Sequence, residues 1–137
     1  MDNVQYFLWL LDQTVNHSVF LWPAGVLLLL AAIAATRSDS HDLLRARVFK
    51  LSLPALIPLL IMVLGTSYVR PSDSLYSPGW AALSVSGLWL LQLLISAYFI
   101  RSFKEIRFFA AALCLFHCWL TCLAAFVAHM SISGVWL

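Results

Sequence analysis

The sequence predicts an all-α integral membrane protein, built as an up-down bundle of four transmembrane helices. Hydrophobic residues make up 63% of the 137 residues and charged residues only 10%, and the mean hydropathy is +0.92. About a quarter of the residues in soluble domains are charged, so a soluble fold of this composition could not cover its surface. Disorder is excluded as well, because disordered chains need low hydrophobicity and high charge. We therefore expect residues 1–137 to form a single membrane domain.

Four stretches without Asp, Glu, Lys or Arg supply the predicted spans. A helix needs about 20 mostly apolar residues to cross about 30 Å of hydrocarbon. The predicted spans are residues 19–36, 51–69, 80–100 and 108–130. The connections between them are short, which favours antiparallel neighbours in a bundle.

The segment that precedes the first span leaves two alternatives open. Residues 3–16 have apolar positions at helical spacing with polar residues between them, a pattern that suits an amphipathic helix lying in the outer interface. The alternative is one long helix over residues 4–36, kinked at Pro23. Pro23 also suits the first turn of a new helix, where its missing N–H is not needed.

The approach to the second span carries a helix start and a pair of prolines. Ser40 is a candidate N-cap for a short helix that begins at His41, and Asp42 is favourable in its first turn. Pro54 and Pro58 each remove a backbone hydrogen bond that lipid cannot replace. We interpret this pair as a fixed kink in preference to a hinge, since fixed proline kinks are common in helices.

The distribution of basic residues predicts the orientation. Segments 37–50 and 101–107 contain seven of the eight Lys and Arg residues, and only Arg70 lies in the segment between the second and third spans. Loops rich in Lys and Arg stay in the cytoplasm, so both termini are predicted to lie outside. The compact chain and its charge bias lead us to expect the bacterial inner membrane.

Small and polar residues share one face of the fourth predicted span, and bulky residues share the other. Small side chains let helix backbones approach, and polar ones find partners on neighbouring helices. We therefore predict a helix-contact face, with Gln92 of the third span as a candidate partner for His117. We favour a structural role in helix packing over a functional role for His117, because one hydrogen-bond partner is enough for a neutral imidazole. The predicted contact residues are Cys114, His117, Cys118, Thr121, Cys122 and Gln92.

The three cysteines and two of the histidines raise the question of a cofactor. Successive cysteines in the fourth span rise by about 6 Å along a helix, so at most two can meet at one ion. Close packing is therefore favoured over a Cu(I) site, and no metal site is predicted. His17 and His129 are both predicted near the outer face, on helices that are neighbours in an up-down bundle. A histidine pair on facing helices can ligate a b-type haem, so these two are candidate axial ligands.

The function class follows from what the sequence contains. It has no carboxylate inside a span, no H-E-x-x-H motif and no Ser-His-Asp set, so no catalytic residues are assigned and no activity of its own is expected. No basic stripe is large enough for nucleic-acid binding. We expect a small accessory or structural subunit of a larger membrane complex, in contact with the lipid bilayer and other membrane subunits. The alternatives are a redox subunit that handles b haem or quinone, and a small homo-oligomeric channel or transporter.

Overall fold

The computed structural model describes residues 5, 8, 12, 18–36, 41–67 and 79–133, and no strand occurs among them. This confirms the all-helical class for these parts of the chain. The helices are α2 (Ser18–Thr36), α3 (His41–Ser52), α4 (Leu56–Ser67), α5 (Gly79–Ser102) and α6 (Arg107–Ser133), with single 3-10 turns at η1 (Leu53–Ala55) and η2 (Lys104–Ile106).

Three helical ranges are long and apolar enough to cross a membrane. They are Ala46–Ser67 with 22 residues, Gly79–Ser102 with 24 and Lys104–Ser133 with 30, and they correspond to the second, third and fourth predicted spans. The apolar part of α2, Leu21–Thr36, is shorter. The chain is therefore a helical membrane protein, while the fourth crossing and the outward termini stay predictions.

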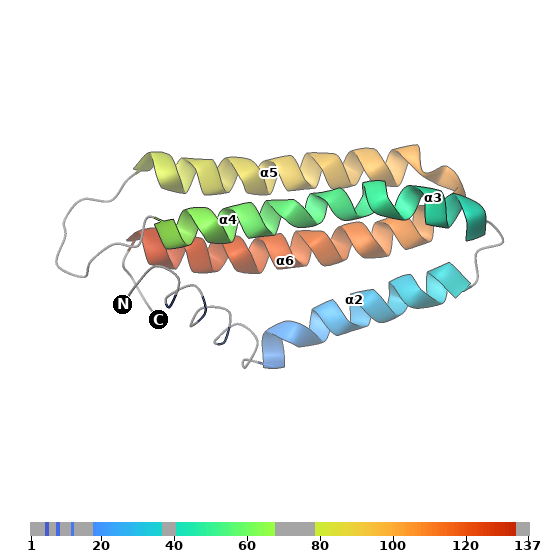
Figure 1. The fold of residues 1–137 in the computed structure, drawn as a ribbon, viewed down its shortest axis with the longest axis horizontal. Helices are drawn as coiled ribbons and strands as arrows, with labels where there is room; N and C mark the ends of the chain where they lie inside the picture. Colours follow the sequence, from blue (N-terminus) through green and yellow to red (C-terminus); the bar gives the residue numbers. More distant parts are fainter. Residues whose placement is uncertain are drawn as a thin grey trace.

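Helix α6 lies at the centre of the bundle. It packs against α2, α4 and α5, whereas α4 and α5 contact one another less. The long helices run alongside each other, and α2 is inclined to the rest (Figure 1). In a square four-helix bundle each helix shares its contacts with two neighbours. Here one helix supplies a surface to all the others.

A 3-10 turn that contains Pro54 interrupts the helix at the start of the second span, and the choice between a fixed kink and a hinge stays a prediction. Helix α3 begins at His41 with Asp42 in its first turn, which confirms the predicted start. Ser40, the predicted cap, lies outside the described residues. The chain then tightens into the 3-10 turn η1 around the buried Pro54. The Ser52 hydroxyl donates to the carbonyls of Val48 and Phe49, at 3.1 and 2.9 Å.

A close approach between helices joins α4 to α6 at Gly65. A Cβ atom built on Gly65 would lie 2.7 Å from Ala128 Cβ and 2.8 Å from Ala128 Cα, well inside the normal separation of about 3.5–4.0 Å between carbons. Both residues are buried. Only glycine at position 65 therefore permits this packing distance.

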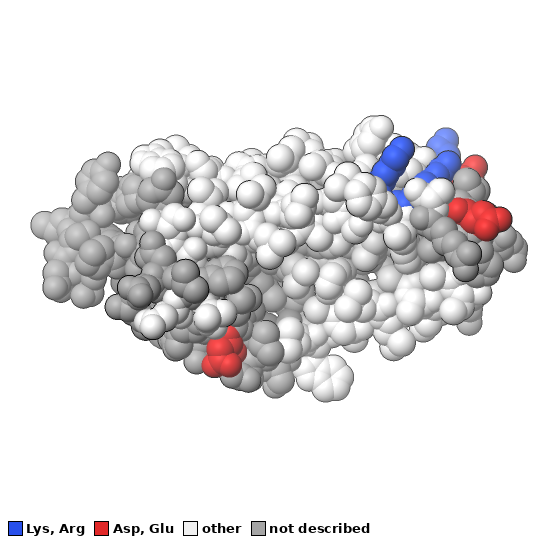
Figure 2. Space-filling model, in the orientation of Figure 1, with Lys and Arg blue, Asp and Glu red and all other residues white. Residues whose placement is uncertain are grey.

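The Lys and Arg side chains that are visible in Figure 2 lie at one end of the bundle. Arg47 of α3 forms an ion pair with Glu105 of η2, with Nη1 and Oε2 3.3 Å apart. The same guanidinium lies over the Phe103 ring, 5.2 Å from its centroid. Helix α3 and the turn η2 therefore meet at the same end of the bundle.

Candidate functional site

The buried stripe of α6 follows a seven-residue repeat. Its members alternate at spacings of four and three residues, the pattern that keeps one side of a helix facing its neighbours. Most are small, which permits the close approach of α4 and α5. They are Ala110, Cys114, His117, Thr121, Ala124, Ala128 and Ser131.

The predicted contact residues divide between this stripe and its open side. Cys114, His117 and Thr121 of α6 are buried, as is Gln92 of α5. Cys118 is half-buried and Cys122 is exposed. Ala125 and His129, which continue the same side of α6, are also only partly covered. The chain's own helices thus cover one part of the predicted face and leave the adjacent part open.

A buried polar cluster links α5 to α6 behind this open side. Gln92 Nε2 donates to Ser96 Oγ at 3.4 Å, and Ser96 Oγ lies 3.3 Å from Cys118 Sγ. Gln92 Oε1 and His117 Nδ1 are buried and have no hydrogen-bond partner among the described residues. The structure therefore forms no hydrogen bond between these two atoms, and the cluster holds α5 to α6 mainly through Ser96.

The open side of α6 is the floor of a groove, which we call the α6 groove. One part has a volume of about 340 Å³ and is walled by α5 and α6. A second part, of about 300 Å³, adds Leu27 of α2. Trp89 and Cys122 line both parts, so the two adjoin. The remaining lining residues are Ser86, Leu90, Leu93, Leu115, Cys118, Trp119, Ala125, Phe126 and His129.

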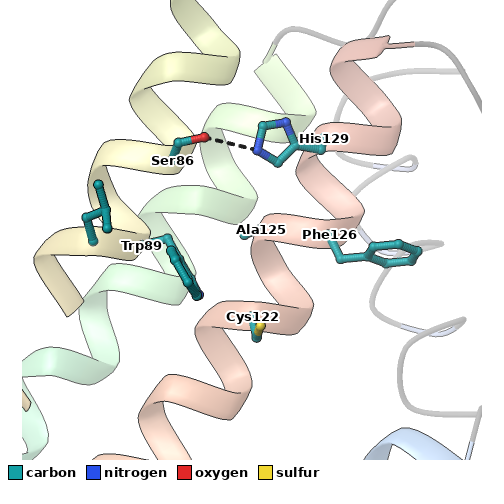
Figure 3. Close-up of a pocket in the computed structure, with 7 residues that line it drawn as sticks. Ser86, Trp89, Cys122, Ala125, Phe126 and His129 are labelled. Atoms are coloured by element: carbon teal, nitrogen blue, oxygen red, sulfur yellow. Dashed lines mark hydrogen bonds between the residues drawn. The ribbon is translucent and has the colours of Figure 1, made fainter. Parts of the chain in front are cut away.

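One end of the α6 groove is polar. Ser86 Oγ and His129 Nε2 lie 3.4 Å apart across it (Figure 3). The Ser86 hydroxyl also donates to the Ala82 carbonyl at 3.0 Å, and the tautomer of the His129 ring decides whether Nε2 donates to Ser86 or accepts from it. Below this pair, Trp89 and Cys122 face the groove. The groove therefore has a hydrogen-bonding end and an apolar body.

The structure describes only one of the two candidate haem ligands. His129 lies on α6 at the polar end of the α6 groove, whereas His17 lies outside the described residues. Their pairing therefore stays a prediction. Within the described ranges, no three His, Cys, Asp or Glu side chains come together in a way that could hold a metal ion.

Comparison of the chain with protein-family models, curated proteins and solved structures gave no match. Sequence reasoning did not identify Ser86 and Trp89 as groove residues. The sequence feature that indicates the groove is the wide face of small and polar residues on α6. This face is wider than the part that the neighbouring helices of the chain cover.

Proposed function

We propose that the chain is a small accessory subunit of a larger membrane complex, and that the α6 groove receives a transmembrane helix of a partner subunit. The observation that carries this proposal is the partly uncovered row Cys118, Cys122, Ala125 and His129. In lipid, helices associate through close packing and interhelical hydrogen bonds, so small and polar residues mark their interfaces. Where such residues face the chain's own helices, as at Thr121, they are fully buried.

The dimensions of the groove support a helix as its occupant. Cys118 and His129 are about three turns apart on α6, or about 16 Å, which is roughly half of the hydrocarbon thickness. Trp89 stands on the α5 side and Leu27 on the α2 side. A helix of the partner in this position would cover Cys122 and could hydrogen-bond to His129.

The charge distribution supports a placement in the bacterial inner membrane with both termini outside. The cations of α3, α5 and η2 lie at one end of the bundle, which the positive-inside rule assigns to the cytoplasm. The opposite end holds the Ser86–His129 pair. The polar end of the α6 groove would then open near the outer leaflet.

A substitution at Cys122 tests the proposal. Cys122→Trp fills the groove from an exposed position, so the bundle should stay folded while the partner is released. Leu83→Trp is the matched control, because Leu83 is 74% exposed on α5 and does not line the groove. The measurement is co-purification in gentle detergent, combined with cross-linking from the native Cys122 thiol to a transmembrane segment of the partner.

The outcomes of this experiment are distinct. The proposal requires that Cys122→Trp removes a partner that Leu83→Trp retains, and that the cross-link maps to the partner's membrane segment. Equal retention by both variants would refute it. A cross-link to a second copy of the chain would instead favour the homo-oligomeric channel or transporter.

The polar end of the α6 groove favours a second candidate, a redox subunit that handles quinone or b haem. A quinone ring could accept a hydrogen bond from His129 while its tail lies along Trp89 and Cys122, since the groove is polar at one end only. A b haem would use His129 with His17. The visible spectrum of the purified chain and an organic extract test these ideas, and His129→Ala should remove either signal.

A further inference from the structure

A second groove lies at the charged end of the bundle, between α2 and the beginning of α6. Its volume is about 700 Å³. Leu30 and Ile33 of α2 line one side, and Lys104, Arg107 and Phe108 line the other. The groove thus joins an apolar wall that faces the hydrocarbon to a basic rim at the end of the bundle. We call it the basic-end groove.

The charges on its rim are unequal. Glu105 also lines the basic-end groove, but its carboxylate is paired with Arg47 at 3.3 Å. Lys104 and Arg107 are exposed and have no ion pair with a described residue in the structure. The rim therefore presents two cations whose charge is not balanced by the acid beside them.

We propose that the basic-end groove binds an anionic phospholipid. Its phosphate lies between Lys104 and Arg107, and an acyl chain lies along Leu30 and Ile33 of α2. Phe108 is 87% exposed directly after Arg107, so an apolar side chain follows the rim into the membrane. A soluble anion would leave the apolar wall uncovered, and an uncharged lipid would leave the cations unmatched. Only a charged amphiphile meets both parts of the groove.

The expected strength follows from the number of cations. A Lys or Arg near an anionic membrane surface contributes about 1 kcal/mol, or about fivefold in affinity. Replacing both rim cations should therefore weaken binding by about 25-fold. If the basic end instead attracted anionic lipid only through its total charge, affinity would fall equally wherever at that end two cations were removed.

The test uses the whole chain in a neutral detergent, titrated with phosphatidylglycerol or phosphatidylcholine and read by native mass spectrometry. Lys104→Gln/Arg107→Gln is compared with Lys50→Gln/Arg101→Gln, which removes the same charge from exposed positions that do not line the basic-end groove. We expect the first pair to lower phosphatidylglycerol affinity about 25-fold and the second to change it by less than about threefold. Helical circular dichroism verifies that both variants are folded.

A third variant tests the apolar wall. Ile33→Trp keeps every charge but fills the groove, so it should also weaken phosphatidylglycerol binding. Glycerol phosphate, which has the anion without the chains, should not compete at equal concentration. Equal loss in the two charge variants, equal affinity for phosphatidylcholine, an unchanged affinity of Ile33→Trp or competition by glycerol phosphate would each overturn the proposal.

Discussion

The contact between Gly65 and Ala128 makes a sharp prediction about how α4 is held against α6. Gly65→Ala adds a single methyl group, which would lie 2.7 Å from Ala128 Cβ and 2.8 Å from Ala128 Cα. Neither atom can rotate away, because one is backbone and the other is attached directly to it. The two helices must therefore separate by about 1 Å to reach a normal carbon separation.

The magnitude follows from two opposing terms. Overpacking in a tight core costs about 1–3 kcal/mol, and a clash against backbone places this case in the upper part of that range. Alanine is favoured over glycine inside a helix by up to about 1 kcal/mol. We therefore expect Gly65→Ala to lower the free energy of unfolding by about 1–2 kcal/mol.

Gly87→Ala is the matched control, because a Cβ at Gly87 meets nothing within 4 Å. It should leave stability unchanged or raise it by up to about 1 kcal/mol. The assay is equilibrium unfolding in mixed micelles, followed by circular dichroism. In the double variant Gly65→Ala/Ala128→Gly, stability should recover only in part, since the contact with the Cα of residue 128 remains. Equal stability of Gly65→Ala and Gly87→Ala would refute this account of the packing.

Three further predictions follow from the helix contacts and the charge distribution. Gln92→Leu should change the unfolding free energy by less than about 1 kcal/mol in the same assay, because it removes one long hydrogen bond and one unpaired oxygen. A loss above about 2 kcal/mol would mean that the amide has another partner. Glu105→Gln should lower the free energy of unfolding by less than about 1 kcal/mol, since its ion pair with Arg47 is partly exposed. A larger loss in the same unfolding assay would contradict this. A carboxy-terminal reporter that is active only in the cytoplasm should show no activity. Strong activity would show that the predicted orientation is wrong.

Much of the helix order could be predicted from the sequence. The second, third and fourth spans are marked by long charge-free runs, and lipid leaves a helix as the natural state for such runs. The start at His41 and the 3-10 turn around Pro54 follow from local backbone chemistry. These features depend on residues that are close together in the chain, so their effects need no knowledge of the rest of the fold.

The arrangement of the helices around α6 could not be predicted in the same way. The periodicity of α6 shows which residues share a face, but not which part of that face α2, α4 and α5 will cover. The contact at Gly65 depends on meeting Ala128 across the bundle, and no residue near Gly65 identifies that partner. The α6 groove likewise depends on how α2 and α5 are spaced over α6, which is a property of three separate segments.

The central position of α6 has a consequence for the biogenesis of the protein. Synthesis proceeds from the amino terminus, so α2, α4 and α5 are made before the helix against which all three pack. Until α6 arrives, those helices can make only their lesser contacts with each other. Most of the native contacts between helices can therefore form only after α6 has been made. A chain interrupted before Arg107 would contain α2, α4 and α5 but would lack the helix against which all three pack.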